Sequence, residues 1–146
     1  MHELVEEAAV AASVDAVWAD FTDATYLVEW FWPPRLGATA TLDPHQGGSW
    51  RVRSEVAGIG VDATVLESER PHTLRLAWRW DGEDHSTDAE ITLEPTADAT
   101  RVKVRHSGFQ SEDERDTHIE GWSHCLQRLV DRHGGAPGQH LRPDTA

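Results

Sequence analysis

The aromatic residues of this sequence have the types and spacing that best indicate a function. There are seven tryptophans, but only three phenylalanines and one tyrosine. Residues two apart in a strand point to the same face of a sheet. This period brings one set of residues onto the apolar faces of predicted strands, namely Trp50, Trp78, Trp80, Val104 and His106. Trp122 faces them from a predicted helix. An aromatic wall with one or two polar groups is typical of a pocket for a small apolar molecule, so these are candidate ligand-binding residues.

The alternative for the indoles is structural. A tryptophan buries a large area, and a sheet whose other residues are small can use tryptophans to fill its core. His106 has the same two interpretations. It ends an apolar phase, so its ring should point inward, where a neutral imidazole can orient a ligand hydroxyl or carbonyl. A structural histidine would instead bond a neighbouring backbone carbonyl.

Metal binding and nucleophilic catalysis have little support in the sequence. His118, His124 and Cys125 lie on one predicted helix, but positions i, i+6 and i+7 do not present a compact set of metal ligands. Cys125 has no neighbouring activating motif, and no G-x-S-x-G segment occurs. We therefore expect no metal and no cofactor, and we assign no catalytic residue.

The candidate pocket residues depend on a sheet to position them. Five segments alternate between apolar and polar or charged residues, as expected of strands: 50–56, 61–65, 73–80, 88–93 and 101–106. Consecutive strands with one apolar and one charged face indicate an antiparallel meander that is wet on its outer side. Its inner face needs an apolar cover.

A predicted helix supplies that cover. Within residues 111–133, one helical stripe consists of Ile119, Trp122, Leu126, Leu129 and Val130. Ser13 is a predicted N-cap for a first helix, and a second short helix is expected from Tyr26 to Trp30. Residues 3–12 suit a first strand or the start of a helix. We expect one domain over residues 1–133 and a flexible C-terminal tail over residues 134–146.

This order of elements resembles a known family. The segments that carry the resemblance are 14–23, 27–31, 47–50, 69–78, 100–109 and 118–122. Together they resemble the activator of Hsp90 ATPase homologue 1-like (AHSA1-like) family of the SRPBCC, or START/Bet v 1-like, superfamily. The resemblance implies an α+β helix-grip fold, in which an antiparallel curved sheet wraps around a long C-terminal helix and two short helices follow the first strand. It also implies an internal cavity.

The resemblance gives a second set of candidates. In the family, the region after the second helix borders the cavity entrance, and here it holds Trp30, Phe31 and Trp32 before Pro33-Pro34. Trp30 and Trp32 are therefore further candidate ligand-binding residues. The alternative is that this aromatic segment only packs onto the sheet edge.

Charge and cysteine content limit the partners. The net charge is −13 at pH 7, which argues against nucleic acid and against an anionic membrane surface. Cys125 is the single cysteine, and the start of the chain lacks the basic region of a signal peptide, so we expect a cytoplasmic protein. We expect a monomer or a homodimer.

The leading functional prediction is non-catalytic binding of a small apolar or aromatic molecule, in a carrier, sensor or sequestering role. One alternative is an enzyme of the polyketide cyclase or aromatase kind in the same cavity, which would need an acid–base pair. The sequence offers His106 with Glu29 or Ser54 for that purpose. The other alternative is a protein-interaction or co-chaperone module.

Overall fold

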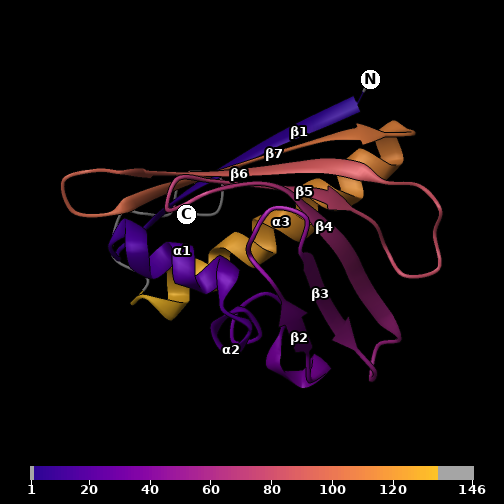
Figure 1. Cartoon of the computed structure of the whole chain (residues 1–146), viewed down its shortest axis with the longest axis horizontal. Helices are drawn as coiled ribbons and strands as arrows, with labels where there is room; N and C mark the ends of the chain where they lie inside the picture. The colour runs from indigo at the N-terminus through magenta and orange to yellow at the C-terminus, as the bar shows by residue number, and fades with distance from the viewer. Residues whose placement is uncertain (1, 135–146) are drawn as a thin grey trace.

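The computed structural model describes residues 2–134, in which one antiparallel sheet curves around a long helix (Figure 1). The strands are β1 (His2–Val10), β2 (Thr39–Leu42), β3 (Ser49–Ser54), β4 (Ile59–Glu69), β5 (Thr73–Trp78), β6 (Thr87–Pro95) and β7 (Thr100–Phe109). The helices are α1 (Val14–Thr22), α2 (Ala24–Leu27), the 3-10 helix η1 (Pro34–Leu36) and α3 (Glu112–Arg132). The strand order is β1-β7-β6-β5-β4-β3-β2, so the first strand closes the sheet beside the last. The predicted helix-grip fold is confirmed.

The helix α3 packs against β1 and β7, inside the curve of the sheet. Its start is fixed locally, because the Ser111 hydroxyl accepts a hydrogen bond from the Glu114 amide at 3.1 Å and the Glu114 carboxylate accepts one from the Gln110 amide at 2.6 Å. This reciprocal arrangement pairs amides that the helix itself leaves without partners. Ser13 caps α1 in the predicted manner, accepting from the Ala16 amide at 3.2 Å.

The core lies between the sheet and α3. The apolar phase of β5 points inward as expected, with Leu74 1%, Leu76 0% and Trp78 3% exposed. From α3, Trp122, Leu126, Leu129 and Val130 are buried, whereas Ile119 is only partly buried. The period of two in the strands and the helical stripe therefore place the core correctly.

Three predicted elements extend further along the sequence than the elements of the structure do. The segment 50–56 ends as a strand at Ser54, and Val56 is 75% exposed because the chain turns through Gly58 at φ 67°. β5 ends at Trp78, and Trp80 only forms an isolated bridge to Val61. The second helix is the single turn Ala24–Leu27 and stops before Trp30.

Two strands flank the predicted meander. The segment 3–12, which suited a strand or a helix, contributes β1 beside β7, and β2 pairs with β3 at the other edge of the sheet. The tail expected over 134–146 lies, apart from Gly134, outside the described residues. None of the helices within residues 2–134 has the length and apolar character needed to cross a bilayer.

Candidate functional site

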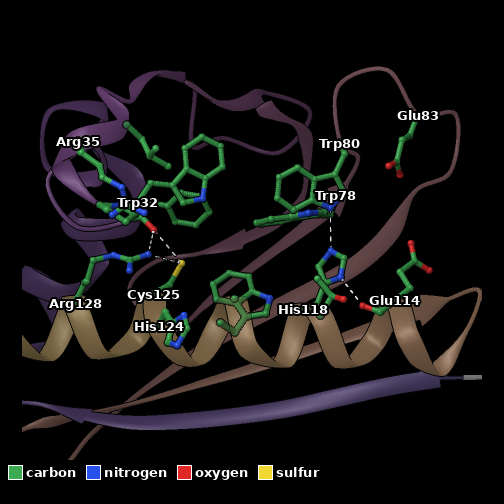
Figure 2. A pocket seen from close by; sticks show the side chains of 16 residues that line it. Trp32, Arg35, Trp78, Trp80, Glu83, Glu114, His118, His124, Cys125 and Arg128 are labelled. Carbon is green, nitrogen blue, oxygen red and sulfur yellow. Dashed lines mark hydrogen bonds between the residues drawn. The ribbon is translucent and has the colours of Figure 1, made fainter. Parts of the chain in front are cut away.

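A pocket of about 540 Å³ opens between α3, the segment 31–36 and the connection from β5 to β6. Its apolar wall is built from Phe31, Trp32, Trp78, Trp80 and Trp122. Figure 2 shows the rings of Trp32, Trp78 and Trp80 beside α3, the helix that carries Trp122. The rings of Trp32 and Trp80 are stacked, with centroids 6.5 Å apart and planes inclined by 10°. The pocket therefore combines two nearly parallel indole rings with one face of α3.

The predicted site residues divide into two groups. Those that line the pocket are Trp32, Trp78, Trp80 and Trp122. Those that lie in the core behind it are Trp30, Trp50, Val104 and His106, each at most 1% exposed. The indole of Trp30 donates to the Asp20 carbonyl at 3.1 Å, and that of Trp50 donates to the Phe21 carbonyl at 2.9 Å. These two indoles therefore hold α1 to the core.

His106 is the centre of a buried chain of hydrogen bonds. The Trp122 indole can only donate, so the His106 Nδ1, 3.0 Å away, accepts from it. The neutral ring then carries its proton on Nε2, which lies 2.6 Å from the Thr87 hydroxyl oxygen. Burial lowers the pKa of His106 to about 3, and the nearby His118 acts in the same direction. Since both ring nitrogens are paired within the protein, these bonds describe a structural histidine.

His118 takes the position at the pocket wall that the sequence suggested for His106. Its Nδ1 lies 2.8 Å from the Glu114 carbonyl, to which it donates. Its Nε2 accepts from the Trp80 indole at 2.9 Å. The dashed lines in Figure 2 follow this chain from Trp80 to α3. His118 therefore fixes the orientation of the Trp80 ring, although β5 has already ended.

Cys125 also lines the pocket, but its thiol is unreactive. Its thiol donates to the Phe31 carbonyl at 2.9 Å. Burial raises the pKa of Cys125 to about 12, and the partial compensation from Arg128 does not reverse this. The thiol is thus protonated at neutral pH and unsuited to nucleophilic attack. Within residues 2–134, no group of three or more His, Cys, Asp or Glu side chains is arranged to hold a metal ion.

The family model for activator of Hsp90 ATPase homolog 1-like protein matches residues 11–134. The chain belongs to this family. The resemblance carried by the sequence segments is therefore confirmed, and the pocket described above is a feature of this member of the AHSA1-like family.

Solved structures repeat the fold. MLL2253 from Mesorhizobium loti has a TM-score of 0.77 at 20% identity, over 89% of this chain and 95% of that one. CalU16 from Micromonospora echinospora has a TM-score of 0.74 at 23% identity, over 92% of this chain and 76% of CalU16. DynU16, a protein in the dynemicin biosynthetic locus, has a TM-score of 0.79 at 25% identity, over 94% of this chain and 49% of DynU16. No curated protein sequence matches this chain.

Charged residues at the pocket of this AHSA1-like protein were missed by the sequence reasoning. Arg35 and Arg128 lie at one end of the pocket, and Glu83 and Glu114 lie at the other (Figure 2). Helical spacing could have found part of this set. The residues 118, 122 and 125 follow one another at spacings of four and three, as do 121, 125 and 128, so they share one face of α3. Arg35 and Glu83 come from connecting segments and carry no comparable signal.

The low pKa of His106 makes stability depend on pH. In the unfolded chain a histidine titrates near 6.5, whereas the folded protein protonates His106 only near 3. Between these values the unfolded state binds more protons, so stability falls as the pH drops through this window. Near pH 5 we expect this one residue to account for a loss of about 2 kcal/mol.

Urea denaturation near pH 7 and pH 5 tests this expectation when the wild type is compared with His106→Gln. The glutamine does not titrate, so the variant should lose about 2 kcal/mol less than the wild type over this interval. Equal losses in the two proteins would show that His106 is protonated as easily in the folded state as in the unfolded one.

Proposed function

We propose that this protein binds a small apolar or aromatic molecule in the pocket without transforming it, as a carrier, sensor or sequestering protein. The observation that carries the proposal is the aromatic pocket of about 540 Å³ beside α3. Ligand pockets of drug-sized molecules have volumes of roughly 300–1,000 Å³ and are lined mainly by apolar and aromatic side chains. The similarity to DynU16, a protein in a biosynthetic locus, gives additional support for a small-molecule ligand.

One indole at the wall has an unpaired donor. Trp78 is 3% exposed, and its Nε1 has no hydrogen-bond partner among the described residues. A buried donor that stays unpaired costs about 1–3 kcal/mol. Several other indoles of this core do have acceptors, as described above, so Trp78 stands apart. Because this Nε1 atom is covered by protein atoms, a ligand oxygen reaches it only if the surrounding side chains move.

The cyclase or aromatase alternative uses the same pocket but needs an acid–base pair within it. Two titratable groups at the wall, His118 and Cys125, are already engaged, whereas Glu83, Glu114 and His124 also line the pocket. His118 has both ring nitrogens paired, and Cys125 holds its proton. Of the partners considered for His106, Glu29 forms an ion pair with Arg132, and the Ser54 hydroxyl donates to the Leu36 carbonyl at 2.7 Å. These contacts favour binding over catalysis.

A panel of flavonoids, aromatic polyketides and fatty acids tests the proposal. A ligand against several indoles should quench tryptophan fluorescence and raise the melting temperature. At a free ligand concentration a hundredfold above Kd, the native state gains about 2.7 kcal/mol. Turnover of a bound polyketide would instead favour the enzyme.

A pair of variants at one position makes this test specific to the pocket. Gly121 lines the pocket, and a Cβ added there meets no atom within 4 Å. Gly121→Phe should therefore fill the pocket and abolish both signals, whereas Gly121→Ala should leave them intact. If no compound of the panel changes fluorescence or melting temperature in the wild type, the binding proposal fails and the interaction-module alternative becomes the stronger one.

A further inference from the structure

We propose that the ligand of this pocket is an aromatic carboxylate, whose anionic group binds to Arg35 and Arg128 while its ring system lies along the tryptophan wall. This inference rests on the proposed binding function and names the class of ligand. It begins from the arginines, because most of them have an evident electrostatic partner in the described structure. Examples are Arg75 with Asp88 at 2.6 Å, Arg79 with Asp62 at 2.9 Å and Arg132 with Asp20 at 3.0 Å.

Arg35 and Arg128, like Arg70 outside the pocket, are exceptions to this pattern. Within residues 2–134 neither makes an ion pair with a carboxylate, and both line the pocket. The chain has 26 acidic residues against 13 basic ones, so an arginine that makes no ion pair is unexpected on composition. A guanidinium is planar and offers five N–H donors in a fork that matches a carboxylate. Two such groups at one end of an aromatic pocket form a site for an anion.

Arg128 is held in place by hydrogen bonds that use only part of its N–H donors. Its Nε donates to the Trp30 carbonyl at 2.9 Å, and its Nη2 donates to the Phe31 carbonyl at 2.8 Å. These bonds fix the guanidinium between α3 and the aromatic segment at the pocket entrance. In the described structure, Nη1 has no acceptor, so its two N–H groups are available to a ligand. The pose of Arg128 is therefore set before any anion binds.

Arg35 supplies a more adaptable donor from the other side of the same end. It lies in η1, is exposed, and makes no side-chain hydrogen bond within the described residues. Figure 2 shows its side chain and that of Arg128 at the same end of the pocket. An exposed arginine loses side-chain entropy on binding but adds a charge-assisted hydrogen bond, which is worth more than a neutral one.

The opposite end fixes the direction in which the ligand lies. Glu83 and Glu114 line that end, and their carboxylates repel an anion there. The protein as a whole has a net charge of −13, so a general attraction for anions does not explain the binding. Only the arginine end favours a carboxylate, and the stacked rings of Trp32 and Trp80 lie between the two ends. A flat aromatic body therefore lies along the indoles with its carboxylate towards the arginines.

The test compares two probes of nearly the same shape, of which one is anionic and the other neutral. We would measure binding of 9-anthracenecarboxylate and 9-anthracenecarboxamide by isothermal titration calorimetry at low salt. The wild type should bind the carboxylate at least about tenfold more tightly, because charge-assisted hydrogen bonds exceed neutral ones by roughly this factor in affinity. Added salt should weaken binding of the carboxylate and leave binding of the amide unchanged, since this end of the pocket is accessible to ions.

Arg35→Gln is the informative variant, because Arg128 also bonds two backbone carbonyls and its removal would disturb the entrance. We expect Arg35→Gln to lower the affinity for the carboxylate about tenfold and to leave the affinity for the amide unchanged. Arg105→Gln is the matched control. It removes the same charge from the outer face of β7, where Arg105 lies 4.0 Å from Glu3, and should change neither affinity.

Three results would overturn the inference, and they are distinguishable. Equal affinity for the carboxylate and the amide, with Gly121→Phe abolishing both, would refute the anion site while the binding function stands. No binding of either probe to the wild type would refute the anion site. If the panel of flavonoids, polyketides and fatty acids then also gave no change in fluorescence or melting temperature, the binding function would be refuted as well. A tenfold loss in Arg105→Gln equal to that in Arg35→Gln would reduce the effect to overall charge and also contradict the proposal.

Discussion

Replacement of Trp122 by alanine is expected to lower the free energy of unfolding by about 3–5 kcal/mol. Trp122 is 3% exposed, and its ring centroid lies 5.3 Å from that of Trp78. The truncation removes the apolar surface that the indole buries and leaves a cavity that α3 and the sheet close only in part. This is a large fraction of a typical stability of about 5–15 kcal/mol.

A polar effect adds to the loss of packing. The Trp122 indole is the donor to the Nδ1 of His106, whose ring is fully buried. Without the indole this nitrogen has lost its donor, and an unpaired buried acceptor costs about 1–3 kcal/mol. Trp122→Phe keeps a six-membered aromatic ring in the core but cannot donate this hydrogen bond, so it loses less packing than Trp122→Ala. We expect that variant to lose about 1–3 kcal/mol.

Urea denaturation of the two variants and the wild type measures these losses. A loss below about 1 kcal/mol for Trp122→Ala would mean that Trp122 faces an open space and contributes little to the core. Because part of the ring lines the pocket, the variant should also change ligand binding. Stability in the absence of ligand is therefore the decisive measurement.

The fold was predictable because its signals are local. Alternation along β5 placed Leu74, Leu76 and Trp78 inside without knowledge of any partner strand. β2 was missed because its burial alternates only between exposed and intermediate positions. The pattern of β5 continued to Trp80 in the sequence, although the strand ends at Trp78. Trp80 keeps its inward phase through a bridge to Val61 and a hydrogen bond to His118.

The site was less predictable because the depth at which a side chain is buried does not follow from the local sequence pattern. The period of two assigns Trp50 and Trp78 to the same kind of face, but only Trp78 reaches the pocket. The difference arises from α1, whose Phe21 carbonyl receives the Trp50 indole. The two pocket arginines come from η1 and α3, which are far apart in the sequence. Their proximity follows from the way in which the segment 31–36 folds back over the helix.

A second large loss of stability is expected at Asp20, a residue that the sequence analysis did not single out. Asp20 lies on α1 and is 2% exposed. Its carboxylate accepts from the Arg132 Nε at 3.0 Å and lies 2.6 Å from the His133 Nε2, both at the end of α3. A charged residue among the apolar positions of α1 is explained by this contact, which ties the first helix to the last.

Asp20→Ala is expected to lower the free energy of unfolding by about 3 kcal/mol, at the lower end of the range for removing one partner of a buried ion pair. The lower end applies because Arg132 keeps a second carboxylate partner, Glu29, and is 21% exposed. Asp15→Ala on the same helix is the control, since Asp15 is exposed and only its favourable position in the first turn is lost, at about 0.3–1 kcal/mol. Equal losses in the two variants, measured by urea denaturation, would show that the contact between α1 and α3 contributes no more than a surface charge does.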